Sequence, residues 1–341
     1  MSLRHLVAIA VIVTTTSGCD NVTWEGVDVR LQAAEPPPGS LEADSVVVEE
    51  PGLPPLPEGP VVYLVRREGA SASAFALASR EGGRMVALPS EEEHPGFTEH
   101  FVRSVLPPGE ELVLFADGQR LGTFVAGGEF GSDRTFCAPR PRVDGIVELV
   151  PGAADAGTWL AVPSREAAGI PRGRWSPPES TPELRTFSLN IAGELMNQFR
   201  SPWPQGTVAA IRRDLTLITP TVPPGIEAEA PRAPFAATFV NEDGLRVGET
   251  GRNAWSLFYV ARYDGTTYRP TLVRYSLFER DGKATSRLMT WSDVTGDGEE
   301  EMLLEVFGTR DRWLALAGYQ DGEWQVLLED ACGESSGTVS Q

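Results

Sequence analysis

Short apolar stretches, separated by turns that contain Gly, run along the chain from residue 61 onward. Stretches of this kind are typical of strands, and turns such as Glu81-Gly82-Gly83 and Asp117-Gly118 join neighbouring strands into hairpins. In the first half of the chain we expect strands at 61–65, 74–78, 85–88, 111–115, 122–126, 146–150 and 159–162. These strands predict a small β domain over residues 61–165, either a sandwich or a barrel.

The C-terminal part alternates apolar and polar residues more regularly, as half-buried strands do. Its Asp-Gly pairs at 264–265, 281–282 and 321–322 are typical of tight hairpin turns. A strand or strand pair is expected at 208–218, before this part begins. Sequential strands are expected at 256–263, 271–278, 285–291, 302–307, 313–319 and 324–328. Together they predict an antiparallel β-meander over residues 235–330.

Aromatic residues recur along the predicted meander, at Trp255, Tyr259, Tyr275, Trp291, Trp313 and Trp324. Aromatic residues at alternate positions of a strand usually fill the core and pack on the sheet faces. We therefore expect them to be core residues. The alternative is an exposed aromatic face that binds glycans or peptides.

One helix is predicted within a connector at 166–234 that is rich in Pro and Gly. Thr181 is a good N-cap residue, Pro182 suits the first helical position, and Glu183 favours the positive end of the helix dipole. Apolar residues then recur at helical spacing, at Leu184, Phe187, Ile191, Leu195 and Phe199. The predicted fold class is therefore mainly β, with two antiparallel β-rich domains joined by a segment with one amphipathic helix at 181–199.

The N-terminus has the pattern of a secretory signal. Arg4 and His5 precede an apolar run at 6–13 that is too short to cross a membrane, and small residues follow it. The ending Thr16-Ser17-Gly18-Cys19 resembles a bacterial lipobox, from which it departs at Thr16, where Leu is usual. The resemblance implies a signal peptide at 1–18 and a Cys19 that is acylated as the first mature residue. The alternative is an ordinary signal peptide that is cut nearby.

Residues 19–60 are rich in Pro and acidic residues, as in Pro36-Pro37-Pro38 and Glu49-Glu50-Pro51. Such a segment is expected to be extended and poorly ordered, so that it holds the folded part away from the bilayer. An edge strand at 46–48 is the alternative. The predicted location is the bacterial cell envelope, outside the cytoplasm, on the periplasmic face or the outer surface.

The chain is strongly acidic, with 48 acidic against 29 basic residues and a net charge of −19. This charge argues against binding to nucleic acid, whose phosphates attract basic surfaces. It would also repel anionic lipid head groups, which leaves the acyl chains at Cys19 as the expected membrane contact. A protein or glycan partner in the envelope is the remaining candidate class.

The chain has three Cys residues. If Cys19 carries the anchor, Cys137 and Cys332 form an even pair in an oxidising compartment. We expect a disulfide between them, which would fasten the C-terminal tail at 331–341 to the first domain. Two separate buried thiols are the alternative.

An acidic loop at 293–301 has side chains of the type and spacing that bind calcium. Calcium loops offer oxygen ligands at odd positions and need a sharp turn at position 6, which Gly makes most easily. Position 6 here is Gly298, and the predicted ligands are Asp293, Thr295, Asp297, the carbonyl oxygen of Glu299, and Glu301. Hard oxygen ligands of this kind suit Ca²⁺. A plain turn is the alternative, because Asp297-Gly298 is one of seven Asp-Gly pairs in the chain.

The loop resembles the calcium loops of the FG-GAP and VCBS repeat families, which also run directly into a hydrophobic strand. It departs from them at Thr295, where Asp or Asn is usual, and it differs from an EF-hand because position 12 is Leu304. The loop occurs once, so a propeller of several such repeats is not expected. The resemblance implies one calcium ion that stabilises the fold rather than taking part in chemistry.

Motifs for nucleophilic catalysis, for zinc proteases and for phosphate binding are absent from the sequence. His94 and His100 could hold a zinc ion together with the acids around them, but an acidic loop that faces solvent is the expected structure. We therefore expect a non-enzymatic binding or structural protein. The alternative is an extracytoplasmic, glycosidase-like hydrolase whose catalytic carboxylates the sequence does not identify.

Overall fold

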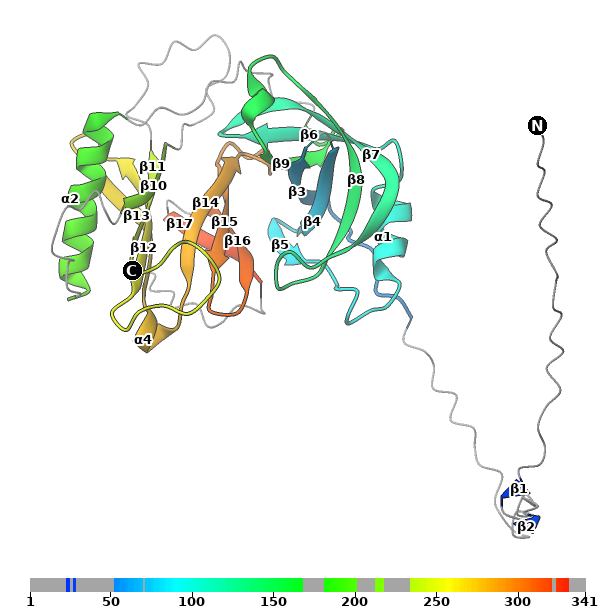
Figure 1. Cartoon of the computed structure of the whole chain (residues 1–341). Helices are drawn as coiled ribbons and strands as arrows, with labels where there is room; N and C mark the ends of the chain where they lie inside the picture. Colours follow the sequence, from blue (N-terminus) through cyan, green and yellow to red (C-terminus); the bar gives the residue numbers. More distant parts are fainter. Residues whose placement is uncertain are drawn as a thin grey trace, which may run out of the picture. The chain divides into compact units, whose positions relative to one another are not determined.

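The structure is a computed structural model that describes residues 23–24, 27–28, 52–69, 71–167, 181–200, 212–217, 234–320 and 323–330. The chain divides into two compact units, at 1–51 and 52–341. In the first unit, β1 (Thr23–Trp24) and β2 (Val27–Asp28) form an antiparallel pair. The second unit contains the remaining strands and the helices (Figure 1). The predicted fold class is confirmed, because the described structure is mainly β with antiparallel sheets.

The first part of the second unit is a closed barrel of six strands, in the order β3-β9-β6-β7-β8-β4, and the pairing of β3 with β4 closes it. Closure leaves no free strand edge in the barrel, and the short β5 extends β4 outside it. The strands are β3 (Val61–Glu68), β4 (Ser71–Glu81), β5 (Arg84–Ala87), β6 (Glu111–Ala116), β7 (Gln119–Asp133), β8 (Arg140–Leu149) and β9 (Thr158–Pro163). A 3-10 helix at Ala153–Asp155 lies between β8 and β9.

Helix α1 (Phe97–Val105) contributes Phe97, Phe101 and Val102 to the core inside the barrel. This helix is not predicted from the sequence, because the acidic residues before and within it indicate a loop that faces solvent. Glu92, Glu93 and Glu99 do face solvent, as expected of that loop. Glu91 accepts hydrogen bonds from the backbone N–H groups of Gly96 and Thr98, so it holds the start of the helix.

The C-terminal strands form two four-stranded sheets, each an antiparallel meander of consecutive strands. One contains β10 (Arg212–Leu217), β11 (Phe235–Asn241), β12 (Trp255–Tyr263) and β13 (Tyr268–Leu277), and the other contains β14 (Thr285–Ser292), β15 (Glu301–Phe307), β16 (Arg312–Gln320) and β17 (Glu323–Glu329). The single meander that the sequence suggested is therefore divided. The division follows β13, where the short helix α4 (Phe278–Asp281) leads the chain into the second sheet.

Three hydrophobic cores stack these elements in layers, in the order helix α2, first sheet, second sheet and barrel (Figure 1). Helix α2 (Pro182–Gln198) packs on one face of the β10–β13 sheet, and the other face packs against the β14–β17 sheet. The β14–β17 sheet packs in turn against the outer wall of the barrel, where Leu303, Leu314 and Leu316 belong to the same core as Val62 and Leu64.

The predicted helix is present, and its N-cap is Thr181, whose side chain accepts a hydrogen bond from the Leu184 N–H at 3.2 Å. The aromatic residues considered as a binding face are all buried in this structure: Trp255, Tyr259, Tyr275, Trp291, Trp313 and Trp324. They are core residues of the two sheets, as expected. The alternative of an exposed aromatic face therefore has no support in the described residues.

Candidate functional site

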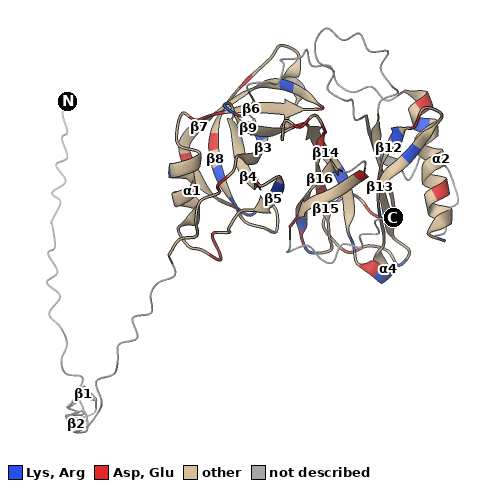
Figure 2. Cartoon of the chain, turned by 180° about the vertical axis from the view of Figure 1, so that it is seen from behind, with Lys and Arg blue, Asp and Glu red and all other residues tan. Residues whose placement is uncertain are grey.

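Residues 293–300 of the acidic loop connect β14 to β15, whose first residue is Glu301, and the Asp and Glu positions are red in Figure 2. Gly296 and Gly298 have φ values of 75° and 92°. Glycine adopts such left-handed conformations without the steric cost that other residues have. The sharp turn that a calcium loop needs at its sixth position is therefore present at Gly298.

Asp293 and Asp297 hold the turn through the backbone. The two carboxylate oxygens of Asp293 accept hydrogen bonds from the N–H groups of Gly296, at 2.6 Å, and Gly298, at 3.0 Å. Asp297 accepts one from the Glu299 N–H at 2.9 Å. Side chains of Asp commonly form turns in this way, so these contacts agree with a calcium loop and with a plain turn alike.

Glu301 lies at the first position of β15 and is buried. Its Oε2 accepts a hydrogen bond from the Val294 N–H at 2.9 Å, and its Oε1 accepts one from the Thr295 hydroxyl at 3.0 Å. The predicted ligands at loop positions 3 and 9 are therefore in direct contact. The fold thus brings Thr295 and Glu301 together, with Asp293 a few residues away on the same loop.

The loop carries partly buried negative charge. Burial raises the pKa of Glu301 to about 7, and the nearby carboxylates of Asp297 and Asp293 add to this increase. Burial also raises the pKa of Asp293 and of Glu300. A bound cation would favour the ionised form of each of these groups, because an opposite charge stabilises a carboxylate.

The chemistry of the predicted ligands fits calcium, since all of them are hard oxygen donors. Their arrangement does not yet form a coordination shell: among the described residues, no three His, Cys, Asp or Glu side chains are grouped to hold a metal ion. The carboxylates here bind backbone N–H groups instead. Each carboxylate oxygen has a further lone pair that could bind an ion. To bind one ion, the loop would have to rearrange so that these oxygens point toward the same position. The calcium ion stays a prediction.

The raised pKa of Glu301 predicts a pH dependence of stability in the absence of calcium. The folded state holds this proton more tightly than the unfolded chain, so stability should fall as the pH rises from 4.5 to about 7. The shift corresponds to about 3 kcal/mol of unfolding free energy. Urea unfolding at about pH 5 and about pH 8 with EDTA should show this loss, and Glu301→Gln should reduce it. A wild-type protein that shows no greater loss than the variant would contradict the prediction.

Two other predicted sites lie wholly or partly outside the described residues. Cys19 and the predicted signal peptide at 1–18 lie outside the described residues, so acylation of Cys19 stays a prediction. None of the described helices is long and apolar enough to cross a membrane. Cys137 is disulfide-bonded, whereas its predicted partner Cys332 lies outside the described residues, two positions after Asp330. The pairing of these two Cys residues therefore also stays a prediction.

A cavity of about 490 Å³ that the sequence did not reveal lies where the barrel meets the end of β17. Acids from distant segments line it: Glu92, Glu93, Glu329 and Asp330. Three of the four are paired with cations, Glu92 with Arg134, Glu329 with Arg274, and Asp330 with Arg140. These contacts do not identify a catalytic pair of carboxylates among the described residues that line the cavity. No catalytic residues are therefore assigned to the hydrolase alternative.

Comparisons of the chain with protein-family models, with curated proteins and with solved structures find no match. The fold is a six-stranded antiparallel barrel that packs against the β14–β17 meander. That meander packs in turn against the β10–β13 meander, which carries helix α2 on its other face.

Proposed function

We propose that this protein is a lipid-anchored component of the bacterial cell envelope, in which one calcium ion stabilises the β body. Its role in this proposal is structural or ligand-binding, with a protein or glycan partner, and not catalytic. The N-terminal sequence supports the anchor, because a signal-like segment ends in a lipobox-like Cys19 and a Pro-rich tether follows. Acyl chains hold such a protein stably at a membrane.

The acidic loop is the observation that carries the calcium proposal. Two glycines make its turn, and the carboxylates of Asp293 and Glu301 are partly withdrawn from water beside further acids. Withdrawing several negative charges from water is unfavourable unless a cation compensates them. A divalent ion with oxygen ligands would supply that compensation.

The surroundings of the loop support a structural role for the ion. Arg80, on barrel strand β4, donates a hydrogen bond to the Thr295 carbonyl oxygen in the loop. The Gly118 N–H, in the β6–β7 turn of the barrel, donates to the carbonyl oxygen of Trp291 at 3.0 Å. An ion that fixes the loop would therefore also fix contacts between the barrel and the β14–β17 sheet.

Calcium should raise the thermal unfolding midpoint of the protein above its value in EDTA. A ligand that binds only the folded state adds about 2.7 kcal/mol of stability at a hundredfold excess over its Kd. Asp297→Ala should abolish the calcium-dependent part of this increase, because it removes the ligand at the fifth loop position. Differential scanning calorimetry with EDTA and then with excess calcium measures the effect.

Asp264→Ala is the matched control, because Asp264 also precedes Gly in a turn and accepts bonds from Thr266 and Thr267. This variant should lose some stability but keep the full response to calcium. If the wild-type midpoint is the same with EDTA and with calcium, the calcium proposal is wrong. The acidic loop would then be a turn held by its own backbone hydrogen bonds.

A further inference from the structure

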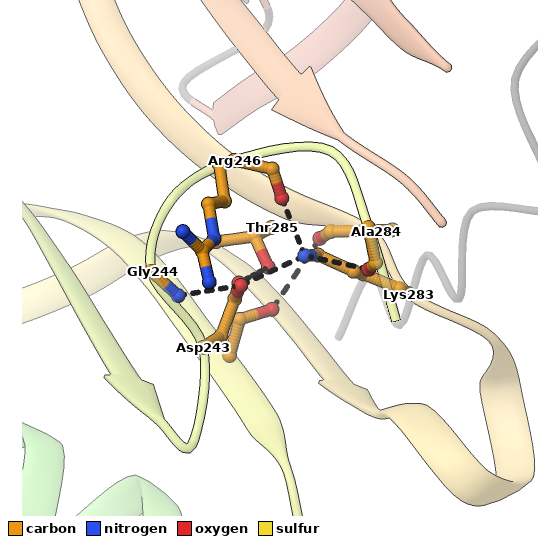
Figure 3. A network of polar contacts seen from close by, with 8 residues as sticks. Asp243, Gly244, Arg246, Lys283, Ala284 and Thr285 are labelled. Atoms are coloured by element: carbon orange, nitrogen blue, oxygen red, sulfur yellow. Dashed lines mark hydrogen bonds and ion pairs between the residues drawn. The ribbon is translucent and has the colours of Figure 1, made fainter. Parts of the chain in front are cut away.

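Lys283 and Asp243 form a buried pair between the two C-terminal sheets (Figure 3). The side chain of each is only 2% exposed, and Lys283 Nζ lies 2.7 Å from Asp243 Oδ1. Asp243 follows β11 of the first sheet, whereas Lys283 precedes β14 of the second. The pair therefore joins segments that are distant in sequence and belong to different sheets.

Further contacts hold both side chains in place. The Thr285 hydroxyl donates a hydrogen bond to Asp243 Oδ2 at 2.6 Å, and the Gly244 N–H donates to Oδ1 at 2.7 Å. Lys283 Nζ also donates to the carbonyl oxygens of Arg246, at 2.6 Å, and Gly248, at 3.2 Å. A primary amine and a carboxylate thus share a site that excludes water, with donors directed at both carboxylate oxygens.

We propose that Lys283 and Asp243 condense to form an intramolecular isopeptide bond. A proton passes from Nζ to Oδ1, and the electron pair released on Nζ forms the new bond to Cγ of Asp243. The bond between Cγ and Oδ1 breaks, and Oδ1 leaves as water with two protons from the former ammonium group. Atoms and charges balance without an oxidant, a reductant or any other reactant.

Several properties of the site favour this reaction. Two groups held in contact react as if at very high concentration, because no encounter has to be arranged. Exclusion of water removes the reagent of the reverse reaction, hydrolysis. The Thr285 hydroxyl is placed to stabilise the negative charge that develops on Oδ2 when Nζ attacks Cγ. In the product, the amide N–H can still donate to Arg246 and the carbonyl oxygen can still accept from Thr285.

The bond would have a clear mechanical consequence. It would link the end of β11 covalently to the start of β14, close to the hydrogen bond from the Thr238 hydroxyl to the Ser286 carbonyl oxygen. The loop that follows Asp243 would be held by the same bond. Glu242 and Leu245, in or beside this loop, have positive φ values of 53° and 51°. Such conformations persist in non-glycine residues when the surrounding structure holds them.

The mass of the chain tests the proposal, after its disulfide has been reduced and with any N-terminal cleavage and acylation counted in the mass calculated from the sequence. We expect a protein that is lighter than its sequence by one water molecule. Protease digestion and tandem mass spectrometry should then find a branched peptide that joins Lys283 to Asp243. A mass equal to that of the sequence, with separate linear peptides, would overturn the proposal.

Loss of water at an Asp-Gly pair needs its own control, because Asp243-Gly244 could form a succinimide of the same mass. Hydroxylamine cleaves the chain at a succinimide and leaves a side-chain amide intact. A lighter protein that hydroxylamine cleaves after Asp243, with no branched peptide, would also overturn the proposal.

Lys283→Arg keeps the positive charge but should restore the full mass calculated for that variant. Thr285→Val should lower the fraction of cross-linked chains. The wild-type peptides decide the question even where a variant fails to fold.

Discussion

Replacing Arg140 with Met is expected to lower the free energy of unfolding by about 3–5 kcal/mol. Arg140 pairs with Asp330 where β8 begins and β17 ends, and their side chains are only 8% and 7% exposed. Burial raises the pKa of Asp330, and the Arg140 guanidinium is the main influence that opposes this increase. The substitution would therefore leave a buried carboxylate without its cation.

The loss of stability in Arg140→Met should come mainly from leaving the Asp330 carboxylate buried without a cation, and not only from losing its attraction to Arg140. The double variant Arg140→Met/Asp330→Leu should therefore recover most of the stability, because a buried ion pair can be replaced by apolar residues at little cost. Asp330 also accepts a hydrogen bond from the Leu314 N–H at 2.9 Å, so recovery should be incomplete. Urea unfolding of the wild type, both single variants and the double variant measures the coupling.

A surface pair provides the control. Arg103 and Glu99 form an ion pair in α1, and their side chains are 73% and 53% exposed. Exposed ion pairs contribute about 0–1 kcal/mol, so Arg103→Met should change the free energy of unfolding by no more than about 1 kcal/mol. If Arg140→Met is equally mild, Asp330 must be solvated or protonated in the folded state. That result would contradict a buried ion pair between Arg140 and Asp330.

The sequence predicted the barrel strands and helix α2 well because local signals agreed with the tertiary structure. Helix α2 has an N-cap, a proline at its start and apolar residues at helical spacing, and all three act within a few residues. Strand β11 was missed. Its run from Phe235 to Val240 is buried throughout, so it lacks the alternation that marks a strand with one solvent face.

The division of the C-terminal meander also could not be seen in the sequence. The Asp281-Gly282 pair predicts a tight hairpin turn, but Asp281 accepts a hydrogen bond from the Leu277 N–H and closes a helical turn. Gly282 then continues with a φ of 79°, and the chain enters the other sheet. An Asp-Gly pair favours a turn without specifying which strands the turn joins.

The candidate site was predictable only in part. Its place between two strands and its turn glycine follow from the sequence. The contacts of its acids do not, because backbone N–H groups compete with a metal ion for the same oxygens. The buried pairs Lys283–Asp243 and Arg140–Asp330 join positions that are 40 and 190 residues apart. One sequence shows no sign of such long-range partners.

Replacing Trp313 with Ala is expected to cost about 3–5 kcal/mol of unfolding free energy. Trp313 lies in the core between the two C-terminal sheets and is fully buried. Its Nε1 donates a hydrogen bond to Glu329 at 2.8 Å, and Glu329 also accepts one from Arg274 at 2.7 Å. Alanine would leave a cavity between the sheets and would remove one donor from this carboxylate.

A comparison of two Trp→Phe variants separates these effects. Trp324 lies in the same core, but its Nε1 has no hydrogen-bond partner among the described residues. Trp324→Phe therefore removes a buried donor that gains nothing from the fold, whereas Trp313→Phe also breaks a bond to a charged group. Bonds to charged groups contribute about 1.5–3 kcal/mol, so Trp313→Phe should be the more destabilising variant by roughly that amount.

Urea unfolding followed by fluorescence measures both variants. Equal losses would mean that the Trp313 side chain contributes through packing alone and that Glu329 is satisfied by Arg274. A Trp313→Ala variant as stable as the wild type would contradict the buried position of this residue. The aromatic residues of the meander would then have to be reconsidered as a surface for a glycan or peptide partner, because only exposed rings can be removed without leaving a cavity.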